Sequence, residues 1–131
     1  MPQTSKSCLI PIAEAIILSF SEEEFEASIE KLQVILPDAT IIAALDLVDR
    51  DNVIKYTTPW GRCHYEVLGS TATYTVFTNP NYCTCPAFAF SVLLAESHLM
   101  CKHLLATRLG EQLSRCVVRP ISDEELVARI E

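Results

Sequence analysis

Glycine is scarce in this chain of 131 residues, where it occurs only at positions 61, 69 and 110. Three isolated glycines cannot form the GxxxxGK loop that cradles phosphates or the GxGxxG turn that binds a dinucleotide. The sequence therefore excludes ATPases and dinucleotide enzymes of the usual kinds.

A long hydrophobic run is also missing. The longest mostly apolar stretch, residues 8–20, contains Pro11 and Glu14, and it is shorter than the roughly 20 residues that a membrane-spanning helix needs. No basic segment and small-residue cleavage site frame it, so we expect neither a membrane span nor a secretory signal. Because half of the residues are apolar and about a fifth are charged, we expect a single folded domain over residues 1–131.

Positive charge is rare in the first two-fifths of the chain. Residues 1–52 hold three basic side chains against ten acidic ones, which accounts for the whole net charge of −7, and residues 53–131 are neutral. Negative charge repels a phosphate backbone. Contact with nucleic acid through the N-terminal part is therefore disfavoured.

One basic stretch, residues 102–119, departs from this pattern. It contains four basic side chains and only one acidic side chain, Glu111. We interpret the stretch either as a solvated helix face or as a weak contact for nucleic acid or a partner. The candidates are Lys102, Arg108, Arg115 and Arg119, and we expect Arg108 and Arg115 to share a helix face because they are seven residues apart.

Helical spacing of apolar residues predicts three helices within residues 1–51. The first has Pro11 in its first turn. The second follows a capping box, residues 21–24, and Phe20 and Phe25 flank the box as a hydrophobic staple. Pro37 ends the second helix, and Asp38 is expected to cap the third. The predicted buried face of the third helix consists of Ile41, Ile42, Leu45 and Val48.

The apolar period then changes towards two. Residues 52–58, 62–68 and 71–78 are rich in β-branched and aromatic side chains and are separated by short turns, which predicts a three-stranded antiparallel meander. After Pro86 the spacing becomes helical again. A helix is expected from about Lys102 to Cys116, with Gly110 marking a kink or an early end. A second capping box at Ser122 and Glu125 predicts a C-terminal helix within residues 117–131. The fold class is therefore α+β.

Two pairs of potential metal ligands stand out. Cys83 and Cys85 follow the predicted meander, and after fifteen intervening residues Cys101 and His103 open the predicted helix. Three thiolates and one imidazole make a standard closed site for structural Zn²⁺. Because residues two apart in a helix point in different directions, the second pair converges only if Cys101 sits at or before the helix start.

Other interpretations of these residues exist. Cysteines spaced like Cys83 and Cys85 rarely form a disulfide, and nothing in the sequence indicates an oxidising compartment. A nucleophilic Cys–His pair would need an orienting third group that the sequence does not specify. His98 is the one rival ligand. No small-molecule substrate is indicated.

The remaining cysteines have simpler explanations. Cys116 and Cys63 are expected in the core, because each shares a helical or strand period with apolar neighbours. His64 then points away from Cys63, towards solvent. Cys8 is uninformative.

A CxC pair followed by CxH, after a meander and at a helix start, resembles the SWIM zinc finger, and Ala106 fits the extended form of that motif. Residues 44–50, 67–70, 85–93 and 101–106 also resemble the small SWIM-domain subunit of the Shu complex. The similarity covers roughly residues 42–110. It implies that residues 52–116 form a zinc-stapled, ββα-like SWIM module between a helical part (1–51) and a C-terminal helix (117–131). It also implies that Cys83, Cys85, Cys101 and His103 bind Zn²⁺.

The resemblance further implies a role in homologous recombination in the nucleus. The family's subunit is not an enzyme; it pairs with a RecA-like recombinase paralogue, and the pair promotes recombinase filaments on single-stranded DNA. Contact with DNA would then occur mainly through the complex. The candidate partner contacts are apolar side chains that are either buried in the core or presented to the partner: Ile12, Ile16, Ile17, Phe88 and Phe90.

Overall fold

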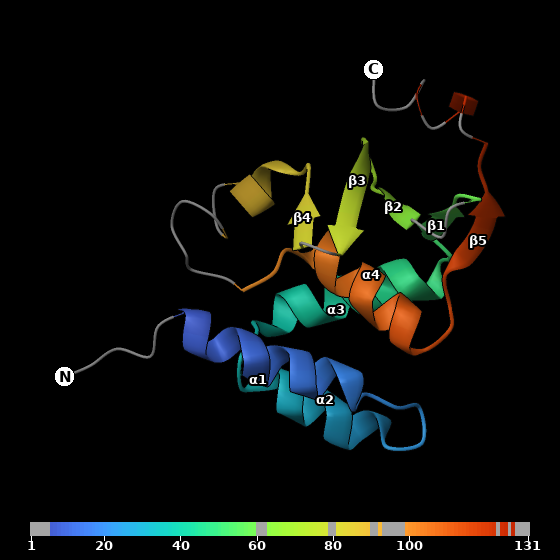
Figure 1. Cartoon of the computed structure of the whole chain (residues 1–131). Helices are drawn as coiled ribbons and strands as arrows, with labels where there is room; N and C mark the ends of the chain where they lie inside the picture. The colour runs from blue at the N-terminus through green and yellow to red at the C-terminus, as the bar shows by residue number, and fades with distance from the viewer. Residues whose placement is uncertain are drawn as a thin grey trace.

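The computed structural model describes residues 6–59, 63–78, 81–89, 92, 99–122, 124, 125 and 127, with the side chains of residues 6–8 left aside. Three helices come first, then four strands, a fourth helix and a fifth strand (Figure 1). In chain order these elements are α1 (Lys6–Leu18), α2 (Phe25–Gln33), α3 (Asp38–Asp49), β1 (Val53–Thr57), β2 (Cys63–Leu68), β3 (Thr73–Thr78), β4 (Asn81–Cys83), α4 (Lys102–Gln112) and β5 (Val117–Pro120). The predicted α+β class is confirmed.

The strands form one mixed sheet in the order β4-β3-β2-β1-β5. Strands β1 to β3 make the predicted antiparallel meander, and β4 extends it by pairing with β3. Strand β5 pairs parallel to β1 on the opposite edge. The meander is therefore correct, but the sheet has two strands that the sequence analysis did not identify.

Strand β5 corrects the predicted C-terminal helix. Residues 117–120, which we assigned to that helix, pair with β1 instead, from Ile54↔Val117 to Thr57↔Pro120. Half of the capping box is confirmed, because the backbone amide of Glu125 donates to the Ser122 hydroxyl at 3.2 Å. The Ser122 hydroxyl also donates to the Glu125 carboxylate at 3.2 Å. Most of the predicted helix beyond it lies outside the described residues.

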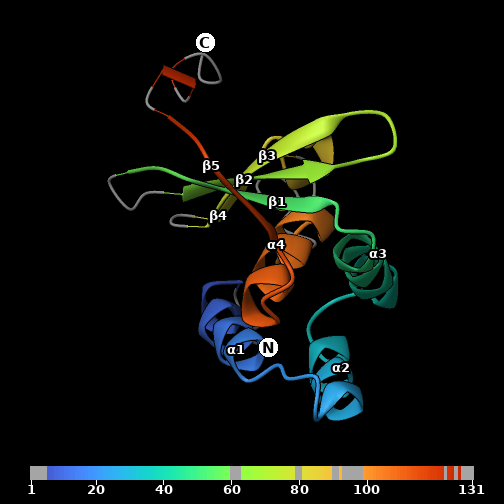
Figure 2. The same ribbon diagram turned by 90° about the vertical axis from the view of Figure 1, so that its right-hand side faces the viewer.

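Helices α1 to α4 lie on one side of the sheet (Figure 2). Helix α4 crosses this inner face and packs most closely against α3, and the core fills the space between them with aliphatic side chains such as Leu104, Leu105 and Leu109. Helix α1 is attached to α4 through an ion pair between Glu14 and Arg108. No helix in the described part of the chain is long and apolar enough to cross a membrane.

The start of α2 confirms the predicted staple and half of the capping box. The rings of Phe20 and Phe25 meet edge to face with centroids 5.7 Å apart, and the Glu24 amide donates to the Ser21 hydroxyl at 3.2 Å. The reciprocal bond differs from expectation, since the Ser21 amide donates to the buried Ser28 hydroxyl rather than to Glu24.

Helix α3 buries a different stripe from the predicted one. Ile41 and Val48 are buried as expected, but Ala44 and Leu47 complete the buried face, and Ile42 is 67% exposed. Asp38 lies inside the first turn, and the residue preceding the helix is Pro37. Helix α4 packs against α3, and a Cβ at Gly110 of α4 would lie 3.9 Å from the Val48 side chain.

The outer face of the sheet corrects two further expectations. Ile54, Tyr56 and Ile121 form a second, small apolar cluster there. His64 lies on this face and is buried against the ring of Tyr56, whereas Cys63, at the strand end, is exposed. The alternation of β2 identified the two faces correctly, but the sequence did not reveal that the outer face is partly covered.

Candidate metal centre

The four predicted ligands converge although they come from opposite sides of a long connection. Cys83 ends β4, Cys85 lies in the turn that follows, and Cys101 and His103 lie at the start of α4. Their potential ligand atoms all lie within 4.8 Å of one another, and all four residues are buried. No other group of this kind occurs among the described residues.

Convergence of the second pair depends on where α4 begins. Cys101 is the residue immediately before the helix, with extended backbone angles (φ −80°, ψ 166°), and His103 is in the first turn. This is the arrangement that the spacing requires. The sulfur of Cys101 also accepts a hydrogen bond from the Leu104 amide at 3.4 Å, in the manner of a helix cap.

The first pair is held by a similar local turn. The sulfur of Cys85 accepts a hydrogen bond from the Phe88 amide at 3.3 Å. Backbone donors directed at sulfur favour the thiolate, which is the form that binds a metal. In each pair of ligands, one cysteine sulfur therefore accepts a backbone hydrogen bond that favours its thiolate form.

One contact to the ring and one to the backbone position His103. The ring of Tyr74 on β3 packs against it with centroids 4.3 Å apart, and the Thr107 hydroxyl donates to the His103 carbonyl at 2.9 Å. The Nδ1 atom is buried without a hydrogen-bond partner in the described structure. A buried polar atom without a partner is unusual, and a metal-binding imidazole accounts for it.

The three thiols influence one another's ionisation. A hydrogen bond from the Cys83 thiol lowers the pKa of Cys101 to about 4, and the same bond raises the pKa of Cys83. Burial raises the pKa of Cys85. A divalent cation would supply the positive charge that allows all three sulfurs to ionise. The donor set, its burial and the orphaned nitrogen thus fit a tetrahedral Zn²⁺ held by Cys83, Cys85, Cys101 and His103.

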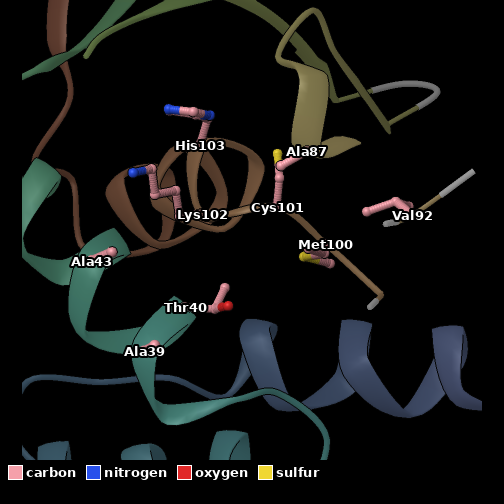
Figure 3. A pocket seen from close by; sticks show the side chains of 9 residues that line it. All are labelled: Ala39, Thr40, Ala43, Ala87, Val92, Met100, Cys101, Lys102 and His103. Carbon is pink, nitrogen blue, oxygen red and sulfur yellow. The ribbon is translucent and has the colours of Figure 1, made fainter. Parts of the chain in front are cut away.

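A cavity of about 350 Å³ adjoins the centre, between α3 and the start of α4 (Figure 3). Cys101 and His103 form part of its wall, and Ala39 and Ala43 of α3 line the opposite side. Neither this cavity nor the contact from Tyr74 was predicted from the sequence. Alternation with buried Val76 would have placed Tyr74 on the inner face, but not beside His103.

The candidate partner contacts differ in their exposure to solvent. Ile12 is 49% exposed, Ile16 is partly buried against the core, and Ile17 and Phe88 are buried. Phe90 lies outside the described residues, as does the rival ligand His98.

The four basic candidates also separate. Helix α4 ends at Gln112, because Ser114 adopts a left-handed conformation (φ 55°) and the Arg115 amide donates back to the Gly110 carbonyl. Arg108 and Arg115 therefore do not share a helix face, contrary to our expectation. Arg108 is paired with Glu14, whereas Arg115 lies 3.9 Å from both Glu22 and Asp49. Lys102 and Arg119 are exposed on different elements.

Comparison with known proteins agrees with the geometry. Residues 74–107 match the SWIM zinc finger family. The chain is similar to zinc finger SWIM domain-containing protein 7 of zebrafish (36% identity over 92% of this chain and 90% of the relative) and of mouse (48% over 67% and 59%). The human protein of that name is 48% identical over 63% of this chain and 60% of its own length. The chain thus spans about three-fifths of the mouse and human proteins. No solved structure matches it significantly.

Proposed function

The chain belongs to the family of zinc finger SWIM domain-containing protein 7, and from this membership we propose that it is a non-catalytic, zinc-binding adaptor. In this role it pairs with a RecA-like recombinase paralogue, and the pair promotes assembly or stability of recombinase filaments on single-stranded DNA during homologous recombination. The proposal rests on the resemblance to the small Shu-complex subunit. It includes a nuclear location, and it includes neither a membrane nor a small-molecule substrate.

Zinc has a structural task in this proposal. With four protein ligands the tetrahedral ion has no open coordination position for a substrate or water. Its role is therefore structural: it crosslinks the four residues that bind it. The ligands would connect the turn after β4 to the first turn of α4, which are separated by a long connection. Because α4 is central to the core, fixing its start fixes the surface that the helices present.

Helix α1 is the surface that we propose to contact the partner. Its inner side contributes Ala13 and Ile17 to the core, yet Ile12 and Leu18 on its outer side are 49% and 64% exposed. Its one acidic residue, Glu14, is occupied by Arg108. A helix that is apolar all round is normally covered on both sides. The uncovered outer side of α1 is the observation that best supports an adaptor.

Co-expression with the recombinase paralogue tests this proposal. We expect the isolated chain to aggregate and the co-expressed chain to be recovered as a soluble complex. Ile12→Asp should abolish co-purification without lowering the zinc content. Ile42→Asp is the matched control, because Ile42 is also exposed but lies on α3, and this variant should retain the partner. A monodisperse isolated chain, or an Ile12→Asp variant that keeps its partner, would contradict the adaptor role.

A further inference from the structure

A row of ring side chains crosses the outer face of the sheet, opposite the helices. Tyr56 on β1 is in register with His64 on β2, and Phe77 on β3 is in register with Tyr82 on β4. His64 and Phe77 connect the two pairs through a ring contact. On the far edge Arg119 of β5 is in register with Tyr56. Every strand of the sheet therefore contributes one ring or one guanidinium to the same row.

The rings are arranged in sequence rather than clustered. The centroids of Tyr56 and His64 are 5.2 Å apart and nearly parallel, with an interplanar angle of 18°, and those of His64 and Phe77 are 6.3 Å apart. Tyr82 rests edge-on against the buried ring of Phe88 at 5.4 Å. These contacts restrict the rings before any ligand arrives, which lowers the entropy lost on binding.

Exposure differs along the row. Tyr56 is buried with Ile121 in the small outer cluster, and His64 is also buried, but Phe77 and Tyr82 are 43% and 46% exposed. Ile54 and Ile121, the aliphatic side chains of the cluster, are themselves buried. Leu68 and Val117 are partly buried against the same cluster, so the most exposed apolar side chains in the row are the aromatic Phe77 and Tyr82. Exposed aromatic rings offer flat surfaces on which nucleobases stack.

In its described residues, the outer face of the sheet carries few charged side chains. The net charge of −7 belongs to residues 1–52, whose helices lie on the opposite side of the sheet (Figure 2). Arg119 is exposed at the end of the row. Glu66 on β2 shares the outer face by alternation with His64, and Glu124 and Glu125 follow Ile121. Binding here must therefore depend on stacking more than on phosphate attraction.

We propose that the outer face of the sheet binds single-stranded nucleic acid, with bases stacked on Phe77 and Tyr82 and a phosphate held by Arg119. Three strand spacings of about 4.8 Å separate Arg119 from Phe77, a distance that a few nucleotides span. Stacking on exposed rings of a sheet is sequence-tolerant and requires unpaired bases. The proposal goes beyond the adaptor role, because it assigns this chain a nucleic-acid site of its own.

Photo-crosslinking tests the site within the purified complex of the chain with its partner. An oligothymidylate carrying 5-iodouracil is irradiated with the complex, and mass spectrometry identifies the crosslinked peptide. We expect a crosslink on the peptide that carries Phe77 or Tyr82. Crosslinks confined to the partner, or to the peptides of Lys102 and Arg115, would overturn the proposal.

Affinity measurements with fluorescent dT15 provide the quantitative arm. Phe77→Ala and Tyr82→Ala should each weaken the contribution of this chain by about 5- to 150-fold, the range corresponding to base–aromatic stacking. Tyr82→Phe keeps the ring and should bind normally. Phe25→Ala is the matched control, since Phe25 is 41% exposed on the helical side, and it should have no effect. Equal losses in Tyr82→Phe and Tyr82→Ala would contradict stacking.

Salt and competitor strands separate this site from other sources of binding. One phosphate contact on a single strand predicts a salt slope of about −0.7 for this chain's share. A 15-base-pair duplex should not compete, and a matched rU15 strand determines whether DNA or RNA is preferred. If Phe77→Ala releases the protein partner and leaves DNA binding intact, the row is a protein interface and the proposal is wrong. If the partner is retained and DNA affinity falls, both this site and the adaptor role stand.

Discussion

The sulfur of Cys101 accepts a hydrogen bond from the backbone amide of Leu104 at 3.4 Å, so one side chain both caps α4 and belongs to the metal centre. The cap places His103 in the first turn of the same helix. Folding of α4 and assembly of the centre are therefore coupled at a single residue. This coupling explains how two ligands only two residues apart can face the same point.

Cys101→Ser separates the two tasks of this residue. Serine is a good helix cap, so the hydrogen bond from Leu104 can be retained, but a hydroxyl is a poor zinc ligand. Structural zinc binding is worth about 10 kcal/mol or more, which is comparable to the whole stability of a small domain. We expect loss of both zinc and the native fold, measured by metal analysis and circular dichroism.

Cys63→Ser is the control for this substitution, because Cys63 is exposed and does not belong to the cluster of four ligands. It should retain one zinc ion per chain and the native spectrum. A Cys101→Ser chain that is folded but free of metal would show that zinc is not a structural staple.

Tyr74 is expected to set how firmly zinc is held. Its ring packs against the imidazole of His103, and groups that orient a metal ligand typically affect affinity by about 10-fold or more. The Tyr74→Ala variant should therefore lose its zinc to a chromogenic chelator at a lower chelator concentration than the unmodified chain does. Tyr74→Phe keeps the ring and should behave like the unmodified chain. If both variants lose zinc alike, the hydroxyl rather than the ring matters.

The ion pair between Glu14 and Arg108 predicts a specific pH dependence. Hydrogen bonding from Arg108 lowers the pKa of Glu14 below its ordinary value of 4.5. Its stabilisation is thus fully present above pH 4.5 and is lost as the pH falls through the lowered pKa. Glu14→Gln should lower the free energy of unfolding at pH 7 by about 1–2 kcal/mol and should flatten the acid limb of the stability profile.

Denaturant unfolding between pH 3 and pH 7 provides this measurement. Glu23→Gln serves as control, because Glu23 is exposed and should leave the profile unchanged. An identical acid limb in Glu14→Gln and the unmodified chain would show that the ion pair does not contribute to stability.

At Gly110 we expect substitution by alanine to destabilise the helix rather than stabilise it. Replacing an interior helical glycine with alanine usually stabilises by about 1 kcal/mol. Here the added Cβ would lie 2.9 Å from the sulfur of Cys116, so Gly110→Ala should destabilise the chain by about 1–3 kcal/mol. The double variant Gly110→Ala/Cys116→Ala removes the sulfur and should recover much of that loss. Thermal melts of the four chains form the cycle, and additive effects would exclude the contact.

Several features were predictable from local sequence because local physics determines them. The paired spacing around Cys83 and Cys101 predicted four ligands that the structure brings together. The staple of Phe20 and Phe25 and the capping hydroxyls of Ser21 and Ser122 depend only on near neighbours. Runs rich in β-branched and aromatic residues, separated by short turns, likewise predicted the meander.

The features that escaped prediction depend on distant parts of the chain. Residues 117–120 form a strand because β1 offers them an open edge, which no local pattern reveals. His64 is buried because Ile121 and Tyr56 form a cluster on the outer face. Ile42 is exposed because the face of α3 that the rest of the fold buries contains Ile41, Ala44 and Val48 instead. Helix α4 stops before Cys116 because Ser114 turns the chain, although serine has no strong preference for that conformation.

The most direct test of the zinc-stapled adaptor is native mass spectrometry of the co-expressed complex during stepwise chelation. One zinc ion per copy of this chain is expected, and removal of that ion should unfold the chain cooperatively and release the recombinase paralogue in the same step. A chain that loses its zinc yet remains folded and bound to its partner would contradict the account.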